Sequence, residues 1–358
     1  MENIKTKRRT VNEWGQESTT VLEENPNGKI KLTEQPTFTT HRSGWNYAMM
    51  SLAPLHNSEG IEFYGFLENE FSWRNQECIE KKIIPFTNPW VGFFHNPQSY
   101  PWWFGVKGMP EVMINSPEFK ESIKECKGIF TLSEHHAEFC RANLDVPIET
   151  LYHPSEIPEK QFDFDNFLRN PRKRLLNVGY WLRKVNSIYS LPIDNQIYTK
   201  TKVLPYEENS PPHRFVENLR KHELKYDQQA RLAFDYFSHE STSHVEELYQ
   251  LTDEEYDDMF SENIVFMDVY TCSASNSVIE AIARATPILA PPIPPVIEYL
   301  GKEYPFYFTH PEEAVQKSFD MDLILKTHRY LKECPMREKL SGEFFREAFT
   351  SSEIYKSL

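Results

Sequence analysis

Long apolar runs are missing from this sequence, and so is a secretory signal. No segment of the 358 residues approaches the length of apolar chain that crosses a bilayer. The first residues, MENIKTKRRT, are basic, and no apolar core follows them as a signal peptide would require. We therefore expect a cytoplasmic protein without a transmembrane segment.

Cysteine is scarce and lacks a pattern. The chain has 5 cysteines, an odd number, and none of them forms a C-x-x-C pair. This spacing argues against both a disulfide framework and a structural zinc site. We expect reduced and mostly buried thiols at Cys78, Cys126, Cys140, Cys272 and Cys334.

Positive charge is also in short supply. The chain has 39 lysines and arginines against 53 aspartates and glutamates, so its formal net charge is −14. Binding to DNA or RNA needs a basic surface that releases counterions, and the acidic balance disfavours it. The dense basic runs at residues 5–10 and 170–174 are interpreted as a solvated tail and a solvated linker. No basic amphipathic helix is apparent, which disfavours a lipid-linked acceptor, while peripheral membrane contact stays open.

Several catalytic signatures are absent. The sequence has no G-x-x-x-x-G-K-[ST], G-x-G-x-x-G, G-x-S-x-G or H-E-x-x-H motif, which disfavours P-loop ATPases, hydride-transferring enzymes, α/β-hydrolases and zincins. His135 and His136 are adjacent and point to different faces, so they do not predict a metal site. Asp163 and Asp165 form a D-x-D pair of a type that can hold a metal, but they fall in a predicted linker. We expect neither a metal nor a cofactor.

The segments that are present predict two α/β domains, as the length also suggests. Residues 1–36 are polar and poorly periodic, which predicts a mobile arm or a short hairpin. Strand-like and helix-like segments alternate over residues 37–160 and again over 172–320, a pattern typical of parallel sheets covered by helices. The charged, aperiodic stretch 158–173 marks the boundary. Residues 321–358 are predicted to form helices that pack back on the first domain.

Polar residues follow the first strand of the second domain, where ligands of α/β sheets bind. The strand RLLNV is followed by Gly179, which would allow a ligand to approach the backbone, and by Arg183 and Lys184, two cations that suit a diphosphate. The alternative is a surface turn with two solvated bases.

A second strand end carries small polar residues at the start of a helix. In SNSVIEAIAR, Ser275, Asn276 and Ser277 lie where exposed N–H groups and the helix dipole attract an anion. Glu280, one turn further, could accept hydrogen bonds from a ribose diol. The alternative is a plain capped helix whose first turn is solvated by Glu280.

Aromatic residues and one histidine follow a strand of the first domain. His95 comes directly after the apolar strand WVGFF. Tyr100, Trp102, Trp103 and Phe104 come next, and such rings can stack on the C–H faces of sugars. The alternative is a loop that packs its own aromatics.

The sequence resembles the GT-B glycosyltransferases. SASNSVIEAIARATPILAPPIPPVIEYLG is similar to their donor-binding segment. The resemblance implies two Rossmann-like domains that face each other across a cleft, a donor site without a metal, and a C-terminal helix that crosses back to the first domain. It also implies that Glu280 corresponds to the second glutamate of the Glu-x7-Glu motif of retaining members, which binds the ribose; the first position is Cys272 here. Arg183 and Lys184 correspond to the diphosphate-binding cations.

On the acceptor side the resemblance rests on HRSGWNYAMMSL and WVGFFHNP. It implies that Ser43 and Gly44 belong to a glycine-bearing first helix and that His95 is the catalytic histidine near the transferred sugar. Glu68, which follows the strand-like IEFYGFL, joins the candidate acceptor-binding residues, together with Tyr100, Trp102 and Trp103.

We expect a metal-independent hexosyl- or pentosyltransferase that moves a sugar from a nucleotide-sugar donor to a glycan or another hydroxyl acceptor. Two alternatives remain: a nucleotide-sugar epimerase on the same fold, and a non-catalytic binding module, which Cys272 supports. The aromatic loop favours a transferase over an epimerase. His95 would act as a base in an inverting enzyme and would hold the donor sugar in a retaining one.

Overall fold

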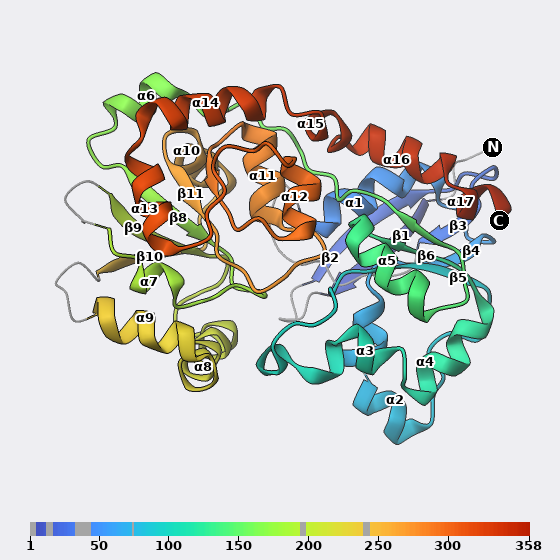
Figure 1. Cartoon of the computed structure of the whole chain (residues 1–358). Helices are drawn as coiled ribbons and strands as arrows, with labels where there is room; N and C mark the ends of the chain where they lie inside the picture. The colour runs from blue at the N-terminus through green and yellow to red at the C-terminus, as the bar shows by residue number, and fades with distance from the viewer. Residues whose placement is uncertain (1–4, 12–16, 33–43, 74, 194–197, 239–243) are drawn as a thin grey trace. The chain divides into compact units, whose positions relative to one another are not determined.

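The structure, a computed structural model, describes residues 5–11, 17–32, 44–73, 75–193, 198–238 and 244–358. The chain divides into two compact units. The first unit consists of Met1–Ser99, Gly105–Glu156 and Glu338–Leu358, and the second consists of Tyr100–Phe104 and Ile157–Arg337. Each unit is built around one parallel sheet (Figure 1).

The sheet of the first unit has five parallel strands in chain order, namely β3 (Ile30–Leu32), β4 (Ile61–Tyr64), β5 (Trp90–Phe94), β6 (Cys126–Thr131) and β7 (Ile148–Thr150). A separate antiparallel hairpin consists of β1 (Lys5–Val11) and β2 (Glu17–Glu23). The helices of this unit are α1 (Trp45–Leu52), α2 (Asn75–Lys81), α3 (Pro110–Met113), α4 (Pro117–Ser122), α5 (Glu134–Asn143), α16 (Gly342–Ser351) and α17 (Glu353–Ser357). Short turns of helix are η1 (Ala53–Leu55), η2 (Asn69–Trp73), η4 (Val106–Gly108) and η5 (Ile123–Glu125).

The strand β5 explains why helices cover both faces of this sheet. All its residues, WVGFF, are buried, as in a central strand without a solvated face. Phe93 contacts Trp45 of α1, with ring centroids 5.0 Å apart, on one face. Phe94, which points to the opposite face, packs 5.9 Å from Phe119 of α4. The C-terminal helix α16 contacts α1, and the Gly342 amide donates to the hydroxyl of Tyr47 at 3.2 Å.

The sheet of the second unit is also parallel and has the order β10-β9-β8-β11-β12. Its strands are β8 (Arg174–Val178), β9 (Thr199–Leu204), β10 (Val245–Tyr249), β11 (Ile264–Phe266) and β12 (Ile288–Leu289). The order reverses at β8, so the chain after β8 leaves toward β9 while β11 lies on the other side. Such a reversal is the usual ligand-binding point of a doubly wound sheet.

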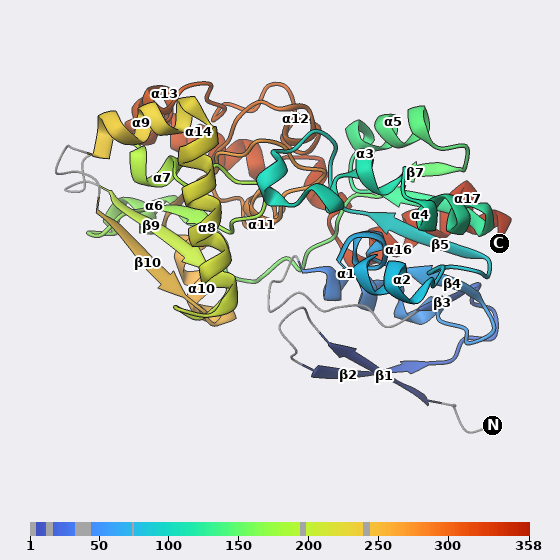
Figure 2. The ribbon, with the colours of Figure 1, turned by 90° about the horizontal axis from the view of Figure 1, so that it is seen from below.

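Helices cover both faces of the second sheet. Figure 1 shows α8 and α9 below this sheet and α10, α11 and α14 above it, and Figure 2 shows α8 crossing the near side of the strands. The helices of this unit are α6 (Phe164–Arg169), α7 (Ser187–Ser190), α8 (Pro211–Tyr226), α9 (Gln228–Ser238), α10 (Asp253–Ser261), α11 (Asn276–Arg284), α12 (Pro294–Leu300), α13 (Pro311–Phe319), α14 (Met321–Lys332) and the turn η3 (Trp102–Phe104). α15 (Met336–Lys339) spans the boundary between the units.

Three boundaries differ from those expected from the sequence. The first sheet begins with β3, which lies inside the range expected to form the N-terminal arm. The sequence did not predict this strand because three residues show too little alternation of polar and apolar side chains. The aromatic segment Tyr100–Phe104 belongs to the second unit, although it was assigned to the first domain. Of the C-terminal helices, α14 belongs to the second unit, and the helices α16 and α17 return to the first.

The five cysteines are buried, as predicted. Among the helices that the structure describes, none has both the length and the apolar character that a membrane span requires.

Candidate functional site

The turn that follows β8 brings Arg183 back beside β11. Gly179 has φ +77°, and no atom lies within 4 Å of the place where its Cβ would stand, so glycine is needed for the backbone conformation and the space beside it is open. Leu182 also has positive φ, 56°, which costs a residue with a Cβ about 1–2 kcal/mol. Its buried side chain helps to hold the turn. The backbone of Arg183 then bridges to Val269.

Arg183 is the central cation of the strand-end cluster. It is only 7% exposed. Its Nη2 donates to Ser275 Oγ at 3.0 Å and to Ser277 Oγ at 3.1 Å, while its buried Nε has no partner in the part of the chain that the structure describes. Among the described residues, Arg183 forms no ion pair with a carboxylate. Burial lowers the pKa of this guanidinium because the charge has lost its water, and the electrostatic effect of nearby groups, Glu280 among them, opposes this shift only in part.

The N-terminus of α11 adds to the positive field around Arg183. Ser275 occupies the position before the helix, but its side chain does not cap the first turn. Asn276, the first helical residue, is exposed. The N–H groups of the first turn and the buried guanidinium therefore both favour an anion at this end of α11.

Lys184 does not join this cluster. Its Nζ pairs with Asp268 at 3.1 Å and lies 5.9 Å from the ring centre of Tyr270. Its backbone N–H also donates to the Asp268 carbonyl at 3.0 Å. The two adjacent cations of the sequence thus have different partners, and Asp268 already neutralises one of them.

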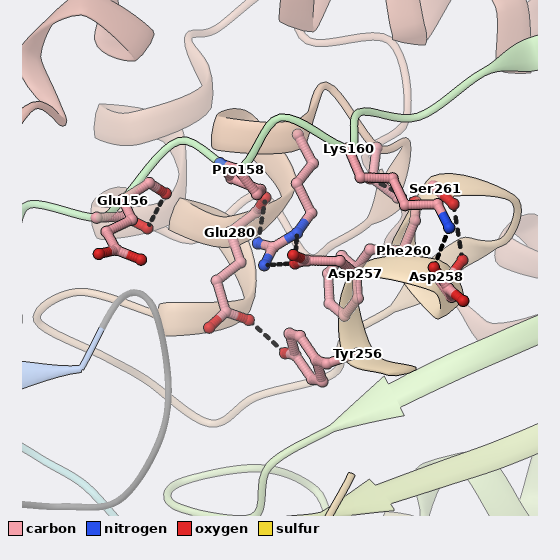
Figure 3. A network of polar contacts seen from close by, with 12 residues as sticks. Glu156, Pro158, Lys160, Tyr256, Asp257, Asp258, Phe260, Ser261 and Glu280 are labelled. Atoms are coloured by element: carbon pink, nitrogen blue, oxygen red, sulfur yellow. Dashed lines mark hydrogen bonds and ion pairs between the residues drawn. The ribbon is translucent and has the colours of Figure 1, made fainter. Parts of the chain in front are cut away.

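Glu280 is turned toward α10 (Figure 3). It is 1% exposed, and its Oε2 accepts a hydrogen bond from the hydroxyl of Tyr256. One turn further along α11, Arg284 forms an ion pair with Asp257, with 2.5 Å between Nη2 and Oδ1. Cys272 is buried, and burial raises the pKa of its thiol to about 12, so it stays neutral and cannot replace a carboxylate.

The sequence did not predict the aromatic cluster that lies at the carboxyl ends of β8, β9 and β10. Tyr180 and Tyr206 follow β8 and β9, and their ring centroids are 5.6 Å apart. Tyr249 ends β10, 6.5 Å from Tyr206. The hydroxyl of Tyr206 is buried and has no partner among the described residues. The strand-end rule would have found Tyr206 and Tyr249 if β9 and β10 had been recognised as strands.

In the first unit, His95 is half-buried between aromatic rings. Its ring stacks on Phe66 at 4.0 Å and meets Trp45 edge-on at 4.4 Å. Nε2 lies 2.7 Å from the Gly65 carbonyl, which assigns the proton to Nε2. Burial lowers the pKa of His95 to about 3, so the imidazole is neutral near pH 7.

Glu68 fastens the turn that carries His95. Its Oε1 accepts from the backbone N–H groups of His95 at 2.7 Å and Asn96 at 2.5 Å. Its Oε2 is buried without a partner among the described residues. Burial raises the pKa of this carboxyl to about 7, against the lowering effect of the backbone hydrogen bonds.

The other acceptor candidates of the first unit are Ser43 and Gly44, and two further histidines of that unit, His136 and His153, are also buried. Gly44 precedes α1 and is buried, and Ser43 lies outside the described residues. His153, after β7, meets Trp45 edge-on at 5.4 Å. His136, on α5, is fully buried, and neither ring nitrogen has a partner among the described residues.

The aromatic segment Tyr100–Phe104 is partly a structural anchor. Tyr100 and Phe104 are buried and contact Trp181, with ring centroids 6.3 and 5.7 Å apart. Trp103 stacks near Tyr226 at 6.3 Å. Trp102 is 48% exposed. Of the predicted sugar-stacking rings, Trp102 is therefore the most open to solvent.

A metal site was not expected, and that expectation stays a prediction. Within the described ranges, no group of three or more His, Cys, Asp or Glu residues is placed to hold a metal ion. Asp163 caps α6 by accepting from the Asn166 amide at 2.8 Å, which gives this half of the D-x-D pair a structural role.

The fold is similar to that of solved trehalose-phosphate synthases. The alpha,alpha-trehalose 6-phosphate synthase from Burkholderia multivorans gives a TM-score of 0.54 at 10% identity, over 87% of this chain and 74% of that one. The UDP-forming synthase from Burkholderia xenovorans in complex with glucose-6-phosphate gives 0.52 at 9% identity, over 86% and 75%. The E. coli structure described as trehalose-6-phosphate bound with UDP-2-fluoro glucose gives 0.53 at 10% identity, over 87% and 77%. This chain has the GT-B fold.

No protein-family model and no curated protein matches the sequence. The GT-B fold confirms the predicted fold class: two parallel five-stranded sheets with helices, and a C-terminal helix, α16, that contacts α1. At identities this low the likeness establishes the fold alone, so the roles of individual residues rest on the geometry described above.

Proposed function

We propose that this chain is a metal-independent glycosyltransferase that moves a sugar from a nucleotide-sugar donor to a glycan or another hydroxyl acceptor. The observation that carries the proposal is the buried guanidinium of Arg183 at the N-terminus of α11, which forms no direct ion pair with a carboxylate of the described residues. A diphosphate would supply an anion that pairs directly with this guanidinium, and it would leave as the nucleoside diphosphate when the sugar is transferred.

The neighbouring residues suit the other parts of a nucleotide. The open space beside Gly179 leaves room for a ligand near the backbone. Tyr180, Tyr206 and Tyr249 offer aromatic faces for a base. Glu280 remains the proposed ribose-binding carboxylate, with Tyr256 as the hydroxyl that orients it. We assign Lys184, which Asp268 neutralises, a supporting role in holding the loop after β11.

In the first unit we propose that His95 forms a hydrogen bond to a hydroxyl of the donor sugar and so positions that sugar for transfer. A general base works best when its pKa lies near the working pH, whereas the pKa of His95 is lowered to about 3 by burial. This favours the hydrogen-bonding role over the base role. Glu68 supports this role of His95 because it accepts a hydrogen bond from the His95 amide. Gly44, which precedes α1, stays a proposed acceptor-binding residue.

The first test is release of free nucleoside diphosphate from a panel of nucleotide sugars, UDP-glucose included, with and without an excess of EDTA. A transferase releases the diphosphate only when a suitable acceptor is present or by slow hydrolysis, and activity should survive chelation. An epimerase would convert the sugar without release. Binding without either reaction would assign the chain to the non-catalytic alternative that Cys272 supports.

The second test is calorimetry of nucleoside diphosphate binding to Arg183→Ala. Loss of a charged hydrogen-bonding partner costs about 1.5–3 kcal/mol, or roughly 10- to 150-fold in affinity. Arg172→Ala is the matched control, because the Arg172 side chain is 62% exposed and pairs with Glu246 in the same unit. If Arg183→Ala and Arg172→Ala bind the nucleoside diphosphate with equal affinity, Arg183 does not bind the diphosphate and the proposal is wrong.

A further inference from the structure

Glu223 of α8 is a buried carboxyl that contacts the turn carrying Arg183. Its side chain is fully buried. Its Oε2 accepts from the backbone N–H of Asn186 at 2.8 Å and from Asn186 Nδ2 at 2.6 Å. Its Oε1 lies 3.0 Å from the hydroxyl of Tyr270, which belongs to the segment after β11. One carboxyl thus joins α8 to the segments that follow β8 and β11.

The two partners of this carboxyl hold the chain on both sides of Arg183. Asn186 follows Arg183 by one turn of the chain. The backbone N–H of Tyr270 donates to the carbonyl of Leu182, the residue before Arg183, at 3.0 Å. The backbone bridge between Arg183 and Val269 lies between these two contacts. A displacement of Asn186 or Tyr270 would therefore move the guanidinium relative to the start of α11.

The hydroxyl of Tyr270 has two carboxyl neighbours but only one hydrogen. It lies 2.7 Å from Asp227 Oδ2 and 3.0 Å from Glu223 Oε1. Burial raises the pKa of Tyr270, so the hydroxyl keeps its own hydrogen. That hydrogen can be donated to one carboxyl at a time. Both contacts are hydrogen bonds only if the other carboxyl is protonated and donates to the Tyr270 oxygen.

The surroundings of the two carboxyls favour Glu223 as the one that holds this proton. Asp227 Oδ1 accepts from the amides of Gln229 at 2.9 Å and Ala230 at 3.0 Å, and the start of α9 stabilises a negative charge there. Glu223 lies in the last turn of α8, where the helix dipole disfavours a negative charge. Burial raises the pKa of Glu223 to about 7, against the lowering effect of its hydrogen bonds.

Other charged and titratable groups surround these carboxyls without reversing this preference. They are Tyr189 of α7, Lys202 of β9, Glu247 of β10, Glu217 and Arg220 of α8, and Lys184 and Asp268 beside Tyr270. Lys202 opposes the effect of burial on Glu223, but burial also lowers the pKa of Lys202 itself, to about 8. The arginine and the other lysine of this group each pair with an acid of the same group, at 3.0 and 3.1 Å.

We propose that Glu223 is a positioning residue of the donor site, which holds the turn of Arg183 while its carboxyl is protonated and weakens diphosphate binding when the proton passes to solvent. Without this proton, two charged carboxylates meet at the single hydroxyl of Tyr270, so one contact is lost and the turn shifts. The new negative charge also repels the diphosphate. The inference rests on the proposed function and adds regulation by pH to the same site.

Calorimetry with UDP-glucose at pH 5.5 and pH 8 tests the inference, because the diphosphate diester of this probe keeps its charge over that range. The unchanged protein should bind about tenfold more weakly at pH 8, the ratio expected when only the form protonated at a pKa of about 7 binds well. Glu223→Gln should bind tightly at both pH values. Glutamine keeps an oxygen for Asn186 and offers an N–H to Tyr270, but it carries no charge.

The comparison between these two proteins isolates Glu223. Lys202 also loses charge near pH 8, but it is present in both proteins, so the difference between them belongs to Glu223. Glu312→Gln is the matched control, since Glu312 is an exposed glutamate of α13 in the same unit. It should weaken at pH 8 as the unchanged protein does. A contact that served only to keep the fold would not give tighter binding at pH 8 when it is replaced.

A second measurement needs no ligand. The NMR signal of the Asn186 backbone amide, which donates to Glu223, should shift with a midpoint near pH 7 in the unchanged protein and should not do so in Glu223→Gln. If the amide titrates but UDP-glucose and the other nucleotide sugars of the panel do not bind, the proposed donor site is wrong and the proton on Glu223 is confirmed.

Three results would overturn the inference and leave the proposed function intact. One is equal UDP-glucose affinity of the unchanged protein at both pH values. Another is an equal loss of affinity at pH 8 in Glu223→Gln. The third is weak binding of Glu223→Gln at both pH values, which would mean that Glu223 acts as a charged carboxylate.

Discussion

At the scale of single residues, the buried carboxyl of Glu68 makes stability depend on pH. Burial raises its pKa to about 7 in the folded chain, from an ordinary value of 4.5. The folded state therefore binds more protons between these values, and stability is lost as the pH rises from the lower value through the higher one. The loss should approach about 3 kcal/mol at pH 8, given 1.36 kcal/mol per pKa unit.

Glu68→Gln should remove most of this dependence, because glutamine keeps an oxygen that can accept from the His95 and Asn96 amides but carries no charge. Urea unfolding of both proteins at pH 5 and pH 8 measures it. Glu121→Gln is the control, since that side chain is 54% exposed. An unchanged pH dependence in Glu68→Gln would mean that Glu68 is ionised throughout.

His95 makes a second prediction at this scale, for the reaction proposed above. His95→Ala should lower kcat by about 100-fold and leave nucleotide affinity nearly unchanged, as expected for loss of one positioning group. Because burial holds the pKa of His95 near 3, the kcat of the unchanged protein should show no step from this residue above about pH 5. The pH profile of kcat checks both points. If kcat of the unchanged protein changes near pH 6.5 and this change disappears in His95→Ala, His95 acts as a base. If His95→Ala keeps the kcat of the unchanged protein, the catalytic assignment passes to Glu68.

At the scale of elements, a buried ion pair fastens α11 to α10. Arg284 is fully buried, its Nη2 lies 2.5 Å from Asp257, and its guanidinium lies 5.2 Å from the ring centre of Phe260. Arg284→Met would leave the Asp257 charge buried without its cation, which typically costs about 3–5 kcal/mol. Replacing both, as Arg284→Met/Asp257→Leu, should cost less than the single change. Urea unfolding measures both variants, and a double variant less stable than Arg284→Met would contradict this account.

Helices and strands could be predicted from the sequence where buried positions carry apolar residues. WVGFF and RLLNV are apolar because they are buried on both faces. β9, TKTKVL, was missed since its lysines suggest solvent, yet Lys200 and Lys202 are buried. Lys200 Nζ donates to the Leu191 carbonyl at 3.3 Å and Lys202 Nζ to the Val185 carbonyl at 3.2 Å. Only tertiary structure supplies such partners.

The sequence predicted where the candidate site lies, but not which side chain each cation would contact. The rule that ligands bind beyond strand ends led to Arg183, Ser275 and Ser277, which the structure brings together. The same rule could not say that Lys184 would turn to Asp268. Side-chain direction in a turn with two positive φ values depends on backbone geometry that adjacent residue types do not reveal.

At the scale of the whole molecule, distant parts of the chain complete each unit. The first unit includes Glu338–Leu358, and the second includes Tyr100–Phe104. Phe349 of α16 is fully buried, 5.7 Å from Phe63 of β4 and 5.1 Å from Phe130 of β6. The sheet made early in the chain thus lacks part of its cover until the last helices are in place.

This arrangement makes a prediction about which strands depend on α16. Phe349→Ala should destabilise the first unit by about 3–5 kcal/mol, the usual cost of removing a fully buried phenylalanine ring. Hydrogen exchange should rise in β4, β5 and β6 while β8 and β11 stay protected, because Phe349 packs against the first sheet. Phe260→Ala, which removes a fully buried ring from α10, is the matched control and should give the opposite pattern. If either substitution raises exchange in both sheets equally, the two units unfold as one, and the division of the chain into separately stable units is wrong.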